Sequence, residues 1–426
     1  MLGWTYSYVT DLNFDLPQAL VKDGILAPHG PAWKALVVGA NQNISSETIS
    51  RIRKLAVAGL PVIIAGEPGY YPGRSGCHET CFRGELNSLR DERNVHSVRQ
   101  GQVAQKLRAL GLDPQISSQN SSWYTTWRTC GATGSDYALL FNDGSDSSGK
   151  ATFRTTKRPF TLDPWTGERA AVSNYSRGNG TITIPLALRS NQVKIFVFEA
   201  GEHMCHLSSG SPSMLAIESS NASISVHSRS NGEVKTSSGK DHALTSALPS
   251  FMLSNWSLTV SHWEHPSDIY DVETFASIRN SSHSLLDAEL PSWTEITGLE
   301  DVSGVGYYTA SFHWNFSAKA SGAYISFPPI AHAITILVNG NRLPGPDHSS
   351  PLLHITPYLR EGNNEVLAVV PSTMWNYLRT IMTKLRSGGE KSSLITRLGG
   401  NLPSRVSNGI VGNVQIIPYV QIDVRC

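Results

Sequence analysis

The pattern of apolar residues changes near residue 144, and this change limits the folds that the chain can adopt. Upstream, short apolar runs such as ALVVG (35–39) and LPVIIAG (60–66) alternate with amphipathic segments. Such runs are typical of strands buried on both faces between helices. Downstream, short alternating segments are separated by Gly, Pro and Asn, which is typical of antiparallel β-structure. The sequence therefore predicts α/β plus all-β, with the α/β part first.

The first helix of the α/β part is expected in SSETISRIRKLAVAG (45–59). Ser45 or Ser46 can cap its N-terminus and Gly59 can end it. The apolar positions that share one helical face are Ile49, Ile52 and Ala56. Strand–helix–strand units of this size form a small parallel sheet with right-handed crossovers.

A further helix over 103–111 and a third strand over 136–143 complete a Rossmann-like α/β domain, which we place at 32–143. Its loop 66–73 follows a strand end, where ligands of α/β sheets often bind. The loop has neither a GxxxxGK[ST] nor a GxGxxG pattern, so we expect no nucleotide and no other cofactor.

The β part is expected to form two domains. Residues 144–248 contain short strands and an Asn231-Gly232 pair, a strong signal for a two-residue hairpin. We interpret this stretch as a β-sandwich. Residues 249–426 contain more short strands and a second hairpin signal at Asn339-Gly340, which indicates a sandwich or jelly roll.

Charge excludes some classes of partner. The 426 residues carry a net charge of +1, and only 16% of them are charged. A nucleic-acid-binding protein normally shows a basic face, so no nucleic-acid partner is expected. No apolar run approaches 18 residues, and no membrane partner is expected.

Five cysteines leave at least one thiol free if the others pair: Cys77, Cys81, Cys130, Cys205 and Cys426. Cys77 and Cys81 either form a local disulfide or remain two unpaired thiols. Their spacing, even with His203 and His206 added, is not that of a zinc site, so we expect no metal.

The surface carries the marks of a secreted protein. Eight Asn-x-Ser/Thr sequons are present, at Asn43, Asn120, Asn174, Asn179, Asn221, Asn255, Asn280 and Asn315. The opening residues show no basic stretch followed by an apolar core, so they do not form a secretory signal. These two observations conflict, and localisation is left open.

Several stretches resemble known glycosidase modules. SGVGYYTASFHW (303–314), GAYISFPPIAHAITILVNGNRL (322–343) and ITPYLREGNNEVLAVVP (355–371) resemble the galactose-binding-like jelly roll attached to many glycoside hydrolases, including the family 2 sugar-binding type. WKALVV (33–38), ETISRIRKLAVAGLPVIIAGEPGYYPG (47–73) and LDPWTGE (162–168) resemble the C-terminal half of fungal α-L-rhamnosidase-like proteins of glycoside hydrolase family 106. The resemblance spans nearly the whole chain and implies that 249–426 is the jelly roll.

The resemblance implies that the catalytic part lies elsewhere. Members of the family are usually secreted, and their N-terminal half is a (β/α) barrel that holds catalytic glutamates and a calcium ion. Residues 1–31 resemble the segment that follows that barrel, so they are expected to be the remnant after a missing catalytic domain. In that case Trp4, Tyr6, Tyr8 and Phe14 should contribute to an exposed apolar patch.

No position matches the family's catalytic glutamates, so no catalytic residue is assigned. Glu67, Asp163 and Glu168 lie in loops or turns and do not form a recognisable pair. Whether the chain is an enzyme is therefore left uncertain.

Binding of a carbohydrate or a glycosylated small molecule is expected instead. Aromatic rings can stack on sugars while polar side chains bind hydroxyls, and the candidates are Trp263, Tyr307, Trp375 and Asn376. Of the adjacent Tyr307 and Tyr308, at most one can face the core.

Three functions remain open. The chain is an accessory half of a rhamnosidase-like hydrolase that is inactive alone, a stand-alone carbohydrate-binding protein, or a repurposed enzyme or accessory protein of a fungal biosynthetic pathway.

Overall fold

The computed structural model describes residues 3–74, 76–210, 214–219, 223–270, 273–387 and 404–425. Asn221 and Cys426 lie outside the described residues. The chain divides into two compact units, Met1–Ser117 and Ser118–Cys426. It is mainly β, and its described residues form several antiparallel sheets and two small parallel ones. The domain boundaries expected after residues 31, 143 and 248 stay predictions.

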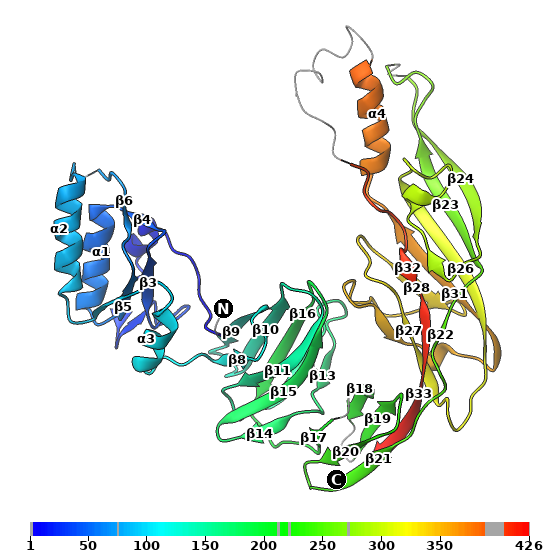
Figure 1. The fold of residues 1–426 in the computed structure, drawn as a ribbon, viewed down its shortest axis with the longest axis horizontal. Helices are drawn as coiled ribbons and strands as arrows, with labels where there is room; N and C mark the ends of the chain where they lie inside the picture. Colours follow the sequence, from blue (N-terminus) through cyan, green and yellow to red (C-terminus); the bar gives the residue numbers. More distant parts are fainter. Residues whose placement is uncertain are drawn as a thin grey trace. The chain divides into compact units, whose positions relative to one another are not determined.

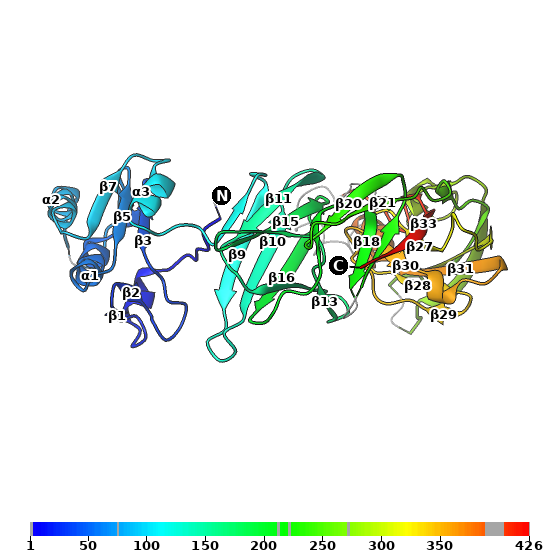
Figure 2. The same ribbon diagram turned by 90° about the horizontal axis from the view of Figure 1, so that it is seen from below.

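The first unit is built on a parallel sheet of order β3-β5-β7. The strands are β3 (Leu36–Gly39), β5 (Val62–Ala65) and β7 (Val95–Val98), and the helices are α1 (Ser46–Val57), α2 (Glu79–Arg90) and α3 (Val103–Ala109). Figures 1 and 2 show α1 and α2 along one face of the sheet and α3 against the other. Two short pairs accompany them: β1 (Val21–Lys22) with β2 (Ile25–Leu26), and β4 (Asn43–Ile44) with β6 (Gly69–Tyr70).

Helix α1 forms as the sequence predicts. The Ser45 hydroxyl accepts a hydrogen bond from the Thr48 amide at 3.2 Å, which satisfies one of the free N–H groups of the first turn. Ile49, Ile52 and Ala56 are buried. Gly59, with φ of +107°, lets the chain leave the helix in a conformation that other residues rarely adopt.

The third parallel strand is β7, and the prediction that residues 136–143 supply it is wrong. Helix α2 leads into β7, and Phe82, Leu86 and Leu89 give α2 its buried face. The sequence of β7, VHSV, is too short and too polar to stand out. Strand β10 (Asp136–Asn142) instead pairs antiparallel with β9 (Trp123–Thr129) in the second unit.

Two antiparallel sheets begin the second unit. One has the order β13-β12-β16-β10-β9, and the other has the order β14-β15-β11-β8. The bounds of the remaining strands are β8 (Ile116–Ser118), β11 (Ser147–Phe153), β12 (Arg158–Leu162), β13 (Arg169–Ala171), β14 (Ser176–Gly178), β15 (Thr181–Leu188) and β16 (Val193–Glu199). Their facing sides bury Leu140, Phe153, Ile184, Phe196 and Phe198.

The outer face of the five-stranded sheet is also apolar along its central strands, whereas Arg128, Thr126 and Arg169 lie on the flanking strands. Strand register places Tyr137 beside Val197, and Val197 beside Phe160; the next row holds Leu139, Ile195 and Leu162. Tyr124 and Phe141 follow in a third row. An antiparallel sheet with one solvated face normally alternates apolar and polar residues. Apolar residues on both faces explain why residues 136–142 read as a doubly buried parallel strand.

Substitutions of Leu139 and Leu140 on β10 test the antiparallel placement of this strand. Leu140 is fully buried, whereas Leu139 is 37% exposed on the apolar outer face. We expect Leu140→Ala to lower the free energy of unfolding by about 2–5 kcal/mol, and Leu139→Ala to lower it by about 1 kcal/mol, because the Leu139 side chain is already partly exposed to water. Chemical denaturation followed by tryptophan fluorescence measures both; equal losses would contradict the antiparallel placement.

A second correction concerns Asn231-Gly232. Strand β19 (Ile224–Ser228) pairs with β18 (Met214–Ser219) and β33 (Gln415–Val424). Strand β20 (Gly232–Thr236) pairs instead with β17 (Leu207–Ser209) and β21 (Asp241–Leu244). The two strands that flank Asn231-Gly232 therefore belong to different sheets, and no hairpin forms there.

The C-terminal part packs two sheets around one large core. The first has the order β24-β23-β26-β31-β28-β29 and the second β18-β19-β33-β27-β30, with β22 beside β33. The bounds are β22 (Phe251–Met252), β23 (Trp256–Glu264), β24 (Ser277–Leu285), β26 (Gly304–Trp314), β27 (Gly322–Ser326), β28 (Thr335–Val338), β29 (Asn341–Arg342), β30 (Leu352–His354) and β31 (Gly362–Pro371). The core between them includes Trp256, Trp293, Tyr308, Ile325 and Ile416.

The hairpin at Asn339-Gly340 is confirmed. Val338 pairs with Asn341, and both turn residues have positive φ values, 51° and 79°, as a two-residue turn requires. A short pair, β25 (Glu289–Leu290) with β32 (Gly412–Asn413), and helix α4 (Trp375–Ser387) complete the elements of this part. Within the described ranges, no helix combines the length and apolarity that a bilayer crossing requires.

The aromatic residues near the N-terminus divide into two groups. Tyr6 and Tyr8 are exposed, together with Val9, Leu12, Leu16 and Leu20. Phe14 packs against the core of its own unit. Trp4 donates a hydrogen bond to the Leu112 carbonyl at 2.8 Å and lies under the Arg108 guanidinium. Only Tyr6 and Tyr8 of the four expected residues are therefore clearly exposed.

The structure decides between the two alternatives for Cys77 and Cys81. Cys77 and Cys81 form a disulfide, and Cys205 is also disulfide-bonded. Cys130 is the free cysteine of the described residues.

Candidate functional site

Two of the four predicted sugar-contacting residues lie on one surface. Trp263 on β23 and Tyr307 on β26 both point away from the core, on the outer face of the six-stranded sheet, where they are 39% and 41% exposed. Register sets Tyr307 opposite Thr259. Trp263 is four residues further along β23, which places the two rings roughly 14 Å apart along the strand direction.

Hydroxyl groups surround the two rings. The side chains that share this outer face, hereafter the hydroxyl face, are Ser257, Thr259, Ser261 and Trp263 on β23, Ile278, Asn280, Ser282 and Ser284 on β24, Val305, Tyr307, Thr309, Ser311 and His313 on β26, and Asn363, Glu365, Leu367, Val369 and Pro371 on β31. Of these, only Glu365 carries a formal charge. Such a surface offers neutral donors and acceptors beside aromatic rings.

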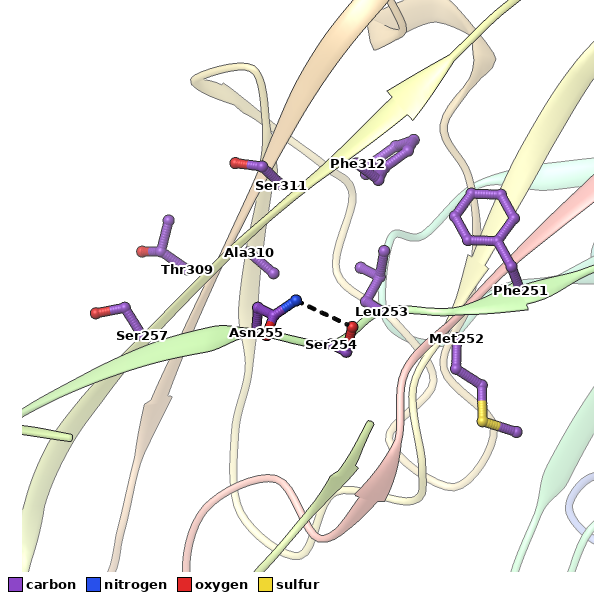
Figure 3. Close-up of a pocket in the computed structure, with 10 residues that line it drawn as sticks. All are labelled: Phe251, Met252, Leu253, Ser254, Asn255, Ser257, Thr309, Ala310, Ser311 and Phe312. Carbon is purple, nitrogen blue, oxygen red and sulfur yellow. Dashed lines mark hydrogen bonds between the residues drawn. The ribbon is translucent and has the colours of Figure 1, made fainter. Parts of the chain in front are cut away.

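A pocket of about 470 Å³ opens at one end of the hydroxyl face. It lies between the turn 251–255 and strand β26, and Ser257, Thr309 and Ser311 belong both to the pocket and to the face. Figure 3 shows their hydroxyl groups on one side and the rings of Phe251 and Phe312 on the other. Its lining residues are Phe251, Met252, Leu253, Ser254, Asn255, Ser257, Thr309, Ala310, Ser311 and Phe312. No acidic side chain is among them.

No sequence motif predicts the pocket. Its lining comes from two segments more than fifty residues apart, so no local motif marks it. A signal was present in the alternation of Ser and Thr with apolar residues in SLTVSH (257–262), which indicates a strand with a hydroxyl-bearing outer side.

Trp375 and Asn376 are placed elsewhere. They begin helix α4, and Asn376 is fully buried. Its amide donates to the Val406 carbonyl at 2.9 Å and accepts from the Val406 amide at 3.0 Å. The Trp375 indole donates to the Ser404 carbonyl at 3.0 Å. Both side chains hold the returning segment 404–406, and no hydrogen bond or ring contact joins either of them to Trp263 or Tyr307 among the described residues.

Tyr308 faces the core, as alternation requires. Its hydroxyl oxygen accepts hydrogen bonds from the Trp293 indole at 2.7 Å and from the Ile410 amide at 3.2 Å. Burial raises the pKa of Tyr308 to about 12, against the two hydrogen bonds, which lower it. Tyr307 therefore lies on the surface, and Tyr308 lies in the core.

We expect Tyr308→Phe to destabilise the protein by about 1–3 kcal/mol, because two buried N–H groups lose their acceptor. Tyr307→Phe should change stability by less than about 0.5 kcal/mol. The raised pKa also predicts that the parent loses stability between about pH 10 and 12, since the unfolded chain releases the phenol proton first. Denaturation at pH 7 and pH 11 measures both effects; a parent stability that does not fall at high pH would contradict the burial of Tyr308.

The acidic residues considered for catalysis make structural contacts. Glu67 pairs with Arg90 at 2.7 Å, and Asp163 accepts hydrogen bonds from the amides of Trp165 and Thr166 in its own turn. A glycosidic general acid needs a carboxyl group with a raised pKa. In the described part of the chain, every carboxyl group with a resolved shift has a lowered pKa.

The causes of these lowered pKa values are local. The hydrogen bond from Arg405 lowers the pKa of Asp301, and that from Arg51 lowers the pKa of Asp15. Burial raises the pKa of Asp347, but hydrogen bonds from Ser349 and Gln192 outweigh it. All three carboxylates are thus held ionised and do not supply a proton.

One group of metal-binding atoms occurs among the described residues, formed by Cys77, Cys81 and Glu85. The two sulfur atoms are joined in the disulfide, so neither is available as a thiolate ligand. This group therefore does not fit a resident metal ion.

The fold is mainly β, with two pairs of antiparallel sheets in the second unit. Among solved structures, it is similar to a rhamnosidase from Novosphingobium sp. PP1Y, with a TM-score of 0.57 and 17% sequence identity. The match covers 97% of this chain and 36% of the rhamnosidase. The chain thus spans about a third of that protein's length, and the likeness shows the fold alone.

Two further solved structures match smaller parts. An exo-carrageenase of GH42 from Bacteroides ovatus has a TM-score of 0.25 and 14% identity over 40% of this chain and 23% of its own. A β-D-mannosidase from Dictyoglomus thermophilum has a TM-score of 0.22 and 16% identity over 40% and 23%. No argument rests on these two. No protein-family model and no curated protein matches the sequence.

Proposed function

We propose that this chain is a non-catalytic, carbohydrate-binding part of a rhamnosidase-like glycoside hydrolase. The observation that carries the proposal is the hydroxyl face, on which Trp263 and Tyr307 are exposed among mostly neutral side chains, with Tyr307 two residues from the pocket residue Thr309. The rings offer apolar surface to the C–H face of a sugar, and the hydroxyl groups exchange hydrogen bonds with it. The near absence of charge favours a neutral sugar.

The assignment to the rhamnosidase class rests on the sequence motifs and on the fold. The motifs resemble glycoside hydrolase family 106, and the rhamnosidase fold matches this chain over nearly its whole length. The ligand is accordingly a rhamnose-containing oligosaccharide or a glycosylated small molecule. A fungal source is consistent with the same motifs.

Two observations favour a non-catalytic role. Glycoside hydrolysis requires two carboxyl groups about 5–9.5 Å apart on either side of the bond, and the pocket has no acidic lining residue. The apolar outer face of the five-stranded sheet is suited to packing, as expected for a part that supports another domain. The alternatives are a stand-alone binding protein and an enzyme repurposed for a biosynthetic pathway.

Hydrolysis tests the non-catalytic assignment directly. We expect the purified 426-residue chain to release no aryl alcohol from an aryl α-L-rhamnoside above the rate in buffer, because it lacks a general acid beside the pocket. Absorbance of the released aryl group is the measurement, with an active rhamnosidase as positive control. Turnover that scales with protein concentration and survives repurification would overturn the assignment.

Binding tests the hydroxyl face. We expect Trp263→Ala and Tyr307→Ala each to weaken binding of a neutral rhamnose-containing oligosaccharide about tenfold, equivalent to roughly 1.4 kcal/mol. Tyr137→Ala is a matched control, since Tyr137 is exposed to 39% but lies on another sheet. Calorimetric titration, after a glycan array has selected the oligosaccharide, gives the affinities. Equal affinities for all three variants and the parent would place the sugar site elsewhere.

A further inference from the structure

Strand β24 is a long strand with one unpaired edge. It lies at the end of the six-stranded sheet, and among the described residues it pairs only with β23. Its nine residues make it the longest edge strand in the described part of the chain, and at the other end of the same sheet β29 has only two. A free edge presents unpaired N–H and C=O groups, which are a template for pairing with another chain.

The usual protections of a free edge are absent from β24. Its sequence, SIRNSSHSL, contains no Pro and no Lys. Its register with β23 is continuous over all nine pairs, so no bulge twists the edge away. Its one permanently charged side chain, Arg279, is paired with Glu264 at 3.0 Å. Apart from Arg279, the strand therefore carries none of the usual features that protect an edge from self-association.

A sequon occupies the middle of the strand. Asn280 is followed by Ser281 and Ser282, and its side chain is exposed on the hydroxyl face. It makes no side-chain hydrogen bond with another described residue. Register puts Asn280 opposite Ser261, one same-face position from Trp263. The amide nitrogen is therefore accessible, and an aromatic ring lies beside it on the same face.

Other sequons of the chain are less suited to carrying a glycan in the folded protein. The Asn120 carbonyl accepts hydrogen bonds from the amide and the hydroxyl of its own sequon serine, Ser122. Asn174 is half-buried, with its amide against Gly210. Asn255 is exposed, but it lies in a turn and not along a sheet edge. Asn280 alone combines an exposed, unbonded amide with a long edge strand, among the described sequons.

We propose that Asn280 carries an N-linked glycan that shields the free edge of β24. In this modification the Asn280 amide nitrogen attacks the anomeric carbon of an oligosaccharide carried on a lipid pyrophosphate. The carbon–oxygen bond to the pyrophosphate breaks, the lipid pyrophosphate leaves, and the amide nitrogen loses one proton. The attached sugar, hydrated and bulky, excludes a second chain from the edge.

The test is expression of the full chain behind a heterologous secretion signal in a eukaryotic host. Glycopeptide mass spectrometry should find Asn280 occupied in most of the secreted, folded molecules. Ser282→Thr preserves the sequon and should preserve the glycan, whereas Ser282→Ala should abolish it. Asn280 without glycan in the secreted protein would overturn the proposal, whatever the state of the other sequons.

Mass measured by light scattering on a sizing column tests the shielding. Asn280→Gln should shift the protein from monomer to higher-mass species as concentration rises. Asn255→Gln, which removes an exposed sequon away from any long edge, should leave it monomeric. An Asn280→Gln variant as monomeric as the parent would refute the shielding role. None of these outcomes depends on whether the hydroxyl face binds an added sugar.

Discussion

The C-terminal strand β33 holds the second unit together. Its ten residues pair with β19, β22 and β27, which come from points up to two hundred residues earlier in the chain. The close packing around Tyr419 shows how tight this arrangement is. The Tyr419 hydroxyl contacts His354 at 2.8 Å and Thr356 at 3.0 Å, and a Cβ on the neighbouring Gly322 would overlap both Tyr419 and Thr356. Gly322 is therefore required where β27 meets β33.

The same strand explains why a proline is tolerated in a central position. Pro418 pairs with Ala323 on one side, while β19 begins to pair only at Val420 on the other. Strand β33 is thus a local edge at Pro418, where a missing N–H removes no ladder hydrogen bond. Because β33 changes partners along its length, it joins β18 and β19 to the C-terminal sheets. No local sequence pattern predicts this pairing.

Local chemistry could be predicted from the sequence, and long-range pairing could not. Helix α1 with its Ser45 cap, the buried β5 and the Asn339-Gly340 hairpin each depend on a few neighbouring residues, and all three are confirmed. The hairpin at Asn231-Gly232 failed because β19 and β20 find partners far away in the sequence. The predicted site residues show the same difference between local and long-range determinants. Trp263 and Tyr307 are exposed and their contact with a sugar stays a prediction, whereas the buried Asn376 is explained only by Val406, thirty residues later.

The two exposed sheet faces of the second unit share an architecture and differ in chemistry. On the five-stranded sheet, Tyr137, Leu139 and Ile195 present apolar surface to water. On the six-stranded sheet, the outward positions of β23 and β24 carry mainly Ser, Thr and Asn, whereas those of β31 include Leu367, Val369 and Pro371. The usual alternation of apolar and polar residues is therefore followed on β23 and lost on β31 and on the central strands of the five-stranded sheet.

An open sheet face also limits the chemistry available there. Shifting a carboxyl pKa upward requires removal from water or a neighbouring like charge, and the hydroxyl face offers neither, with Glu365 as its single carboxylate. Binding demands less: two rings on rigid strands with hydroxyl groups between them are preorganised, so little conformational entropy is lost when a sugar is held. The geometry that makes catalysis on this surface unfavourable is thus the same geometry that suits it to recognition.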